Sequence, residues 1–277
     1  MSVFRLILAG CFSCLAIYLF VSAPEPLPTE TAGEQNLRAV EVERVFHAAN
    51  AVNDAARRIY TGRIVGPGAK AGLKFSEEWA EPGEEAGPLP ALFLRLAAQR
   101  LETKSTRLSL YLGSDEPINK SNLFDGPQMV AFERLKETKQ PVFSEIENVG
   151  TVGMFPDLAS AGPCVTCHNE HPDSPKKDWV LNDVMGATTW TYPRATLGAG
   201  EYLNTTAQLF DAIEEAYGSY LAKAENFSTP VDIGTDWPDE NGLALPDVKT
   251  FMAEVRKAAS ADVIESLILI PDVAAAQ

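Results

Sequence analysis

The sequence predicts an α+β fold in which an antiparallel sheet is flanked by helices. Amphipathic helical segments lie towards both ends of the chain, and β-rich segments lie between them. The β-rich segments lie beside one another in sequence, whereas each parallel pair needs a crossover of a dozen or more residues. The strands are therefore expected to pair antiparallel. An apolar segment precedes this domain and a helical extension follows it.

The chain begins with an apolar segment that predicts a membrane anchor at residues 1–24. Arg5 is followed by an uncharged run from Leu6 to Ala23, which is long enough to span a bilayer as a helix. The same run can act as a cleaved signal peptide, and the sequence around Cys11 is similar to a lipid-attachment box. We favour an uncleaved anchor, because the run is long for a signal and Pro24 follows the place where cleavage would occur.

All three interpretations place the rest of the chain outside the cytoplasm, with Arg5 on the inner side. We therefore expect a single-pass protein of the bacterial inner membrane with its domain in the periplasm, or a protein released there after cleavage. Cys11 and Cys14 are then small apolar residues of the membrane helix. The 38 acidic side chains outnumber the 23 basic ones, which argues against nucleic acid as a partner. The acidity is compatible with a basic redox partner, but a role in solubility alone is the preferred interpretation.

The elements that follow are predicted from periodicity and from turn residues. Residues 25–36 are rich in proline and threonine and predict a linker. Apolar residues at helical spacing predict a first helix over 37–62 with Gly62 as its C-cap, and the glycines and prolines of 66–87 predict a loop. Further helices are expected at 91–103 and 128–138, and strands at 107–112, 141–147, 151–155 and 183–192.

From Gly198 the composition changes to long amphipathic segments. Helices are predicted at 203–224 and 247–270, separated by a loop at 229–246 that is rich in proline, glycine and aspartate. This C-terminal helical region, residues 198–277, is compatible with packing on the preceding domain or with formation of a homodimer.

Cys164-Val165-Thr166-Cys167-His168 is the attachment sequence of a c-type haem. The two thiols can each form a thioether to one vinyl group of the porphyrin, and His168 then supplies the proximal nitrogen to the iron. We expect one covalent haem c. A redox disulfide would need a βαβ context that is not visible here, a zinc site would need further ligands from a chain with few left, and a structural disulfide across so short a loop constrains little.

The haem segment and three other stretches resemble a family of exported monohaem domains of unassigned function. Its members occur alone, as in a cyanobacterial c-haem protein, and as outer sensor regions of bacterial histidine kinases and nucleotide cyclases. The resemblance covers about residues 41–193 and implies a PAS-like sheet with flanking helices, here at 37–197. The stretches that carry it are Cys164 to Trp179 with Asn182 to Gly186, Arg58-Ile59-Tyr60-Thr61, Pro88 to Arg95, and Pro117-Ile118-Asn119 with Asn122.

The sixth iron ligand decides what such a haem does, because a closed site suits electron transfer and an open one admits small ligands. The resemblance implies a cysteine near the start of the domain in the cyanobacterial member, and this chain has none there. His47, outside the apolar stripe of the first helix, is our first candidate, with a surface histidine as the equal alternative. Met154 and Met129 are weaker candidates. His171 is too close in sequence to reach the far face easily, and we expect it to pack or to form a hydrogen bond near the haem edge. Four further side chains could contact the haem without binding the iron. Lys176 and Lys177 could pair with its propionates, and Trp179 and Trp190 could pack on its ring.

Two classes of function follow from the haem. The first is a membrane-anchored periplasmic monohaem cytochrome for electron transfer or redox sensing. The second is a sensor of a gas or small ligand. The signalling members of the family carry a cytoplasmic output domain, and none follows here, so a sensor would act through a partner protein. We expect no enzyme, because the sequence shows no convincing paired carboxylates, nucleophile–histidine pair or phosphate loop.

Overall fold

The computed structural model describes residues 39–160, 162–239 and 242–268, with side chains described as far as residue 264. The predicted anchor at 1–24 and linker at 25–36 lie outside these residues. Among the described helices, none combines the length and the apolar character that crossing a membrane requires.

Four strands form the central sheet, in the order β4-β7-β6-β5, and every neighbouring pair is antiparallel. A tight turn joins β5 to β6, and its Asn148 and Gly150 have φ angles of 62° and 106°, a left-handed region that these two residue types adopt readily. The four strands correspond to the four predicted ones, which confirms the α+β class with an antiparallel sheet. Their bounds are Ser109–Gly113 for β4, Val142–Ile146 for β5, Gly150–Leu158 for β6 and Val184–Tyr192 for β7.

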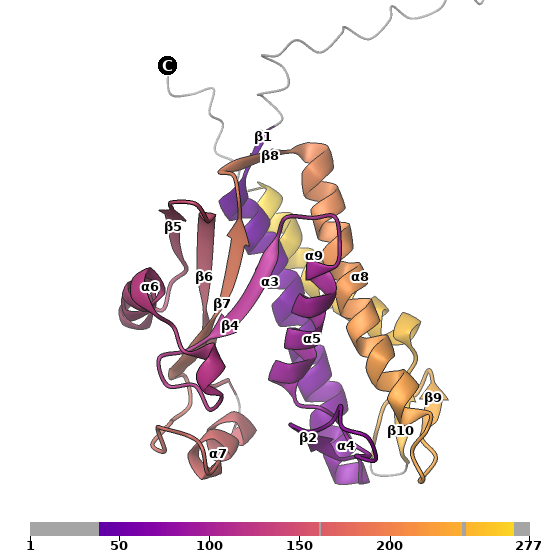
Figure 1. Cartoon of the computed structure of the whole chain (residues 1–277). Helices are drawn as coiled ribbons and strands as arrows, with labels where there is room; N and C mark the ends of the chain where they lie inside the picture. Colours follow the sequence, from indigo (N-terminus) through magenta and orange to yellow (C-terminus); the bar gives the residue numbers. More distant parts are fainter. Residues whose placement is uncertain (1–38, 161, 240–241, 269–277) are drawn as a thin grey trace, which may run out of the picture. The chain divides into compact units, whose positions relative to one another are not determined.

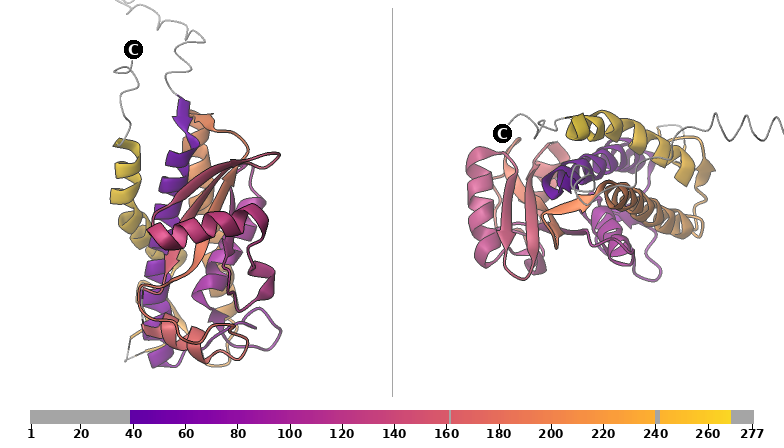
Figure 2. Two further views of the ribbon diagram at one scale, coloured as in Figure 1. Left: turned by 90° about the vertical axis from the view of Figure 1, so that its left-hand side faces the viewer. Right: turned by 90° about the horizontal axis from the view of Figure 1, so that it is seen from above.

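Helices cover both faces of this sheet (Figures 1 and 2). Side chains alternate between the two faces along each strand. On one face, Met154 and Ala187 pack with Phe132 of α6 (Gly126–Thr138) in a small core. On the other face, Phe155 and Trp190 belong to the main core, together with residues of α3 (Val42–Ile59) and α5 (Pro90–Glu102).

The first helix continues beyond Gly62, where the sequence predicted its end. α3 passes into a π-helical segment, Tyr60–Val65, and then into α4, Gly66–Ala71. A glycine inside a helix costs about 1 kcal/mol, but Tyr60 and Ile64 are fully buried here and their burial outweighs that cost. The true end is Gly72, with φ of 106°. The predicted loop therefore starts later, and it also forms a short parallel pair, β2 (Phe75–Ser76) with β3 (Gly87–Pro88).

The C-terminal helices share the main core with the preceding domain. α8 (Ala199–Ala224) packs along α5, and α9 (Val248–Ile268) packs along α3. The rings of Tyr217 and Phe251 stack at 4.1 Å between centroids. β8 (Thr196–Gly198) pairs with β1 (Ala39–Glu41), and the loop before α9 contains the short parallel pair β9 (Asp232–Gly234) and β10 (Ala244–Pro246). The homodimer remains a prediction.

α3 runs from one end of the sheet to the other. It begins beside the β1–β8 pair and ends near α7, Gly162–Glu170, which lies at the opposite end of the sheet (Figure 1). We call the α7 end the base of the molecule. The loop between β6 and β7 carries α7, so the end of β6 and the start of β7 both lie at the base.

Candidate haem site

α7 presents the two cysteines and the histidine of the attachment sequence on one side. Residues three and four apart lie on the same face of a helix, as Cys164, Cys167 and His168 do. Both thiols are free. Burial raises the pKa of Cys167 and lowers the pKa of His168, although Asp157 partly offsets the latter effect. The histidine is therefore held as the neutral imidazole, the form that binds a metal.

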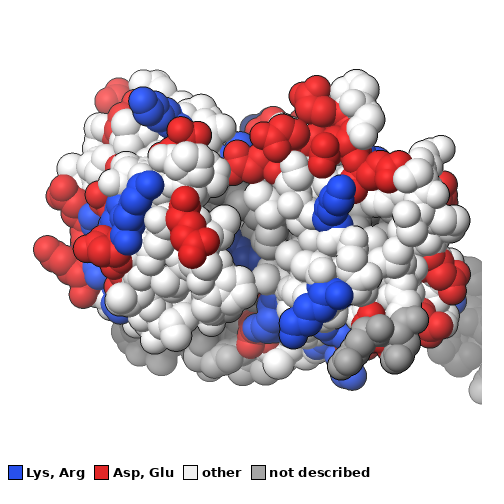
Figure 3. Space-filling model, turned by 90° about the horizontal axis from the view of Figure 1, so that it is seen from below, with Lys and Arg blue, Asp and Glu red and all other residues white. Residues whose placement is uncertain are grey.

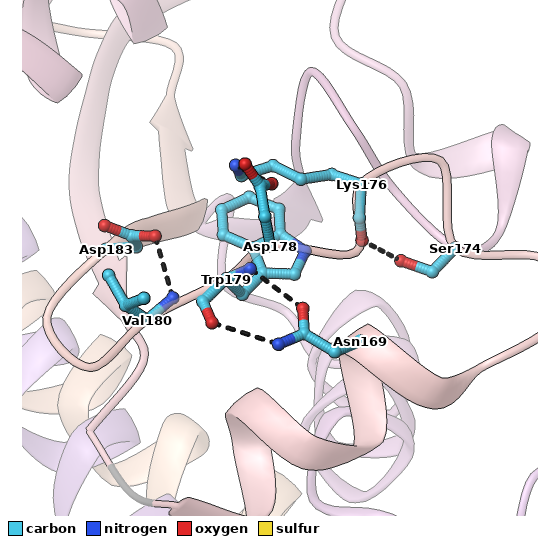
Figure 4. Close-up of polar contacts among 7 residues, drawn as sticks. All are labelled: Asn169, Ser174, Lys176, Asp178, Trp179, Val180 and Asp183. Atoms are coloured by element: carbon cyan, nitrogen blue, oxygen red, sulfur yellow. Dashed lines mark hydrogen bonds and ion pairs between the residues drawn. The ribbon is translucent and has the colours of Figure 1, made fainter.

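Asn169 fixes the loop after α7 to the helix (Figure 4). Its Nδ2 donates to the Trp179 carbonyl at 3.0 Å, and its Oδ1 accepts from the Trp179 backbone N–H at 2.8 Å. Within the same loop, Ser174 Oγ donates to the Lys176 carbonyl at 2.7 Å, and Asp183 Oδ2 accepts from the Val180 N–H at 3.0 Å. The Asn169 side-chain amide thus binds both backbone polar groups of Trp179, and we call this pair of bonds the Asn169 clamp.

Trp179 is the aromatic neighbour of the histidine. Its ring is 4% exposed and meets the His168 ring edge-on at 6.4 Å. Its buried Nε1–H has no hydrogen-bond partner among the described residues, so a donor is left over beside the haem segment. Lys176 lies over the indole at 4.9 Å and pairs with Asp178.

The two lysines with a predicted role towards the propionates have other surroundings. Lys176 lines a cavity of about 300 Å³ together with Lys136 of α6 and Lys139, the residue after α6, on the α6 side of the sheet. Lys177 is exposed. Their contact with propionates remains a prediction.

A cluster of three charged side chains and one hydroxyl lies between α3 and the sheet near the haem segment, and we call it the basal cluster: Asp54, Arg57, Asp157 and Thr188. Arg57 Nη1 forms an ion pair with Asp157 of β6, and its Nη2 donates to Thr188 Oγ1 of β7 at 3.4 Å. Burial acts to lower the pKa of Arg57, but Asp157 and Asp54 outweigh it and the pKa is raised, with a contribution from Cys164. Burial raises the pKa of Asp54, and Arg57 opposes that shift.

The surface is hollowed at the base. Seen from below, a hollow lies between two lobes, and a basic side chain is visible inside it (Figure 3). Figure 1 shows α7 on one side of this end and α4 with β2 on the other. The side chains of Arg57 and Asp157 keep 24% and 34% of their exposure although they join α3 to the sheet. His171 of the α7 loop reaches Glu77 after β2, with 3.5 Å between Nε2 and Oε1.

The structure does not bring His47 to α7. Its residue is exposed, and its ring packs against Phe143 at 5.4 Å and Phe155 at 5.2 Å. Burial of the ring lowers the pKa of His47, and Glu43 partly opposes this. His47 precedes Arg57 by ten residues on one helix, which corresponds to about 15 Å along the axis. His47 therefore lies near the start of α3, whereas the basal cluster lies near its end.

Three other residues with a predicted haem contact, Met129, Met154 and Trp190, lie in the hydrophobic cores. Met154 and Met129 belong to the core on the α6 side. Trp190 is in the main core, where its Nε1 donates to Asn50 Oδ1 at 3.3 Å. His171 follows His168 by three residues, so the two imidazoles cannot take opposite faces of one porphyrin. The remaining described methionines are Met252, which is buried in the helical core, and Met185, which lies at the start of β7, at the irregularity in its pairing with the end of β6.

Sequence reasoning missed the basal cluster, although two signals for it exist. Asp157 continues the alternation of Gly153 and Phe155, so it is a charge on a core-facing position of β6. Asp54 and Arg57 continue the polar stripe of α3 that begins with His47 and Asn50. A charged residue on each of two facing surfaces indicates an ion pair between them, but only the strand register shows that they meet.

The residues at the base fit a covalent haem. Two free thiols and a neutral imidazole project from one helix face, a hollow lies beside them, and the unpaired indole N–H of Trp179 is a donor available to a buried acceptor. Among the described residues, no three His, Cys, Asp or Glu side chains gather as ligands of a bare metal ion.

The fold and the site together define a class of protein, an α+β domain whose C-x-x-C-H helix lies at one end of an antiparallel sheet. The chain belongs to the Tll0287-like family, whose family model matches residues 34–193, more than half of the sequence. This confirms the family resemblance. No curated protein and no solved structure matches the chain.

Proposed function

We propose that this chain carries one c-type haem at its base, bound through thioethers to Cys164 and Cys167 and coordinated by His168. The observation that supports this most directly is the presentation of two free thiols and a neutral imidazole on one face of α7, beside a hollow. The bound haem would supply an iron that changes between the ferric and ferrous states. The protein's own part is to orient His168 through the Asn169 clamp and the Trp179 ring.

Expression of the full chain in a bacterium with a c-type haem maturation system tests this assignment. The protein band on a denaturing gel should keep haem peroxidase activity, because thioether bonds survive denaturation. A well-folded, exported chain that carries no covalent haem would overturn the proposal.

The surroundings that we propose for the domain rest on the sequence. The apolar run from Leu6 to Ala23 supports an anchor in the inner membrane, or else a cleaved signal, and either would place the domain in the periplasm. Family membership supports a PAS-like character for the antiparallel sheet. The acidic charge supports a basic protein partner rather than a nucleic acid, and we propose a carrier or sensor rather than an enzyme.

Two roles remain for the haem: electron transfer or redox sensing with a closed iron site, and sensing of a small ligand at an open one, with the signal passed to a partner protein. The placement of His47, Met129, Met154 and Met252 favours the second role. The ring of His47 packs against Phe143 and Phe155, and the three methionines belong to the two hydrophobic cores. We therefore favour a ligand-responsive haem domain, with electron transfer as the second candidate.

Carbon monoxide distinguishes the two roles. An open ferrous site should bind it rapidly and shift the Soret band of the purified holoprotein. A Soret band that carbon monoxide leaves unchanged would favour electron transfer at a closed site.

A further inference from the structure

The basal cluster has features that the proposed haem attachment does not use. Arg57 is the cation of the cluster, and it lies between two carboxylates, Asp157 and Asp54. It reaches across from α3 to the two central strands, and its charge lies close enough to the haem segment to be influenced by Cys164. Its side chain joins α3 to the sheet by polar contacts and still keeps 24% of its exposure, so part of the guanidinium remains accessible.

Arg57 also keeps unused hydrogen-bonding capacity. A guanidinium has five N–H donors in a fixed fork. One bond goes to Asp157 and one to Thr188, and these two bonds account for only part of the fork. The remaining donors can serve an acceptor in the hollow.

We propose that Arg57 positions small anionic ligands of the haem iron, and that Asp157 limits their affinity. The class of ligand is a small monovalent anion that accepts hydrogen bonds, such as azide, cyanide or nitrite. The inference rests on the proposed haem, since without the iron the anion has no coordination bond.

The opposite roles of the two side chains follow from their charges. Hydrogen bonds from a guanidinium to an anion are charge-assisted and stronger than neutral ones, and the partly buried site reduces screening by water. The carboxylate of Asp157 occupies part of the same fork and repels a second anion. Loss of Arg57 should therefore weaken anion binding, and loss of Asp157 should strengthen it.

Azide titration of the ferric holoprotein, followed by its Soret band, tests the proposal. Arg57→Gln should weaken azide binding about tenfold or more, as expected for one lost charge-assisted bond. Arg57→Lys should restore part of the affinity, because it keeps the charge but not the fork. Asp157→Asn should bind azide more tightly than the wild type. Arg58→Gln is the matched control, since Arg58 is the exposed neighbour on the same helix, and its affinity should equal that of the wild type.

Ligand charge separates this role from a structural one. Carbon monoxide is neutral, so its affinity for the ferrous protein should change little in Arg57→Gln, whereas structural damage would alter the binding of both ligands. The double variant, Arg57→Gln with Asp157→Asn, leaves no unpaired charge in this pair and tests the site even if the single variant folds poorly.

The outcomes separate this inference from the proposed haem. Absence of covalent haem from the wild type defeats the proposed function itself. A haem-loaded wild type that binds no azide, or equal azide affinity in the wild type and Arg57→Gln, overturns only the role of Arg57. Weaker azide binding in Asp157→Asn would contradict the role of Asp157.

Discussion

The two ends of α3 meet the same sheet in different ways. Near its start, the ring of His47 packs against Phe143 and Phe155, and Asn50 accepts a hydrogen bond from Trp190. Near its end, the contact consists of the Arg57–Asp157 ion pair and a hydrogen bond to Thr188. The first end is closed by aromatic rings, whereas the second is polar and partly open to solvent.

The sheet, more than the helix, produces this difference. Along the α3-facing side of β7, a buried Trp190 is followed towards the base by Thr188 and then by Gly186. A Cβ added to Gly186 would lie 2.6 Å from the Gly113 carbonyl oxygen, so this position accepts no larger residue. The side chains on this side of β7 become smaller towards α7. The same helix stripe thus packs against aromatic rings at one end and forms, at the other, the polar contact where we propose a ligand site.

The largest effect is expected at the base, from the attachment sequence itself. Replacement of both Cys164 and Cys167 by serine should abolish covalent haem completely, because no thioether can form. Haem staining of a denaturing gel measures this directly. Serine at both Cys11 and Cys14 is the matched control and should leave the stain unchanged; loss of stain in that control would assign haem attachment to the wrong pair.

The next effect is expected at the closed end of α3. Trp190→Ala should destabilise the protein by about 3–5 kcal/mol, the usual cost of removing a fully buried large aromatic side chain. Chemical denaturation of the haem-free protein would measure the change. Val130→Ala, at a residue 68% exposed, should stay within about 0.5 kcal/mol of the wild type. Equal effects of the two variants would show that this end is not a packed core.

The sequence was sufficient to predict most of the helices and strands, but not the contacts between them. Alternation and periodicity predicted all four strands of the sheet and the helices before and after them. The predicted end of the first helix at Gly62 was wrong, because the burial of Tyr60 and Ile64 outweighs the tendency of a glycine to end a helix. A local signal cannot include contacts with residues far along the chain.

The candidate site divides in the same way. Cys164, Cys167 and His168 form a local motif, and the family match supports their identification. The basal cluster joins residues about a hundred positions apart, Arg57 with Asp157, and only the register of β6 brings them together. The position of His47 outside the apolar stripe predicted its exposure, but it could not indicate that its ring contacts Phe143 and Phe155 of the sheet.

A smaller effect is expected for the Asn169 clamp at the open end. Asn169→Ala should cost about 1–3 kcal/mol, because it removes both partners of the Trp179 backbone groups. Hydrogen exchange of the Trp179 amide should become faster, and proteolysis within residues 171–183 should increase. Asn226→Ala removes one exposed bond to a helix carbonyl and should change neither measurement. A Trp179 amide that remains protected in Asn169→Ala would show that the loop is held by other contacts.

The smallest effect is expected at His47. Burial lowers its pKa in the folded protein, so the unfolded chain binds more protons, and the stability contribution falls as pH drops below the unfolded value of about 6.5. His47→Ala should remove this part of the loss, so its stability should fall less than that of the wild type between pH 7.5 and pH 5.5. Denaturation at the two pH values measures the difference. An equal loss in both proteins would contradict the assigned pKa shift.

The same variant also tests the ligand hypothesis for His47. The spectrum of the reduced His47→Ala holoprotein should match that of the wild type, because the structure places this imidazole against Phe143 and Phe155. A changed spectrum would restore His47 as the sixth ligand.

The spin state of the ferric iron tests most directly whether the haem at the base lacks a second protein ligand. Electron paramagnetic resonance of the purified, full-length ferric holoprotein at neutral pH measures it without any substitution. We predict a high-spin signal, since His168 would be the protein ligand and the opposite position would hold water or remain open. A purely low-spin signal, typical of two strong-field protein ligands, would contradict the account.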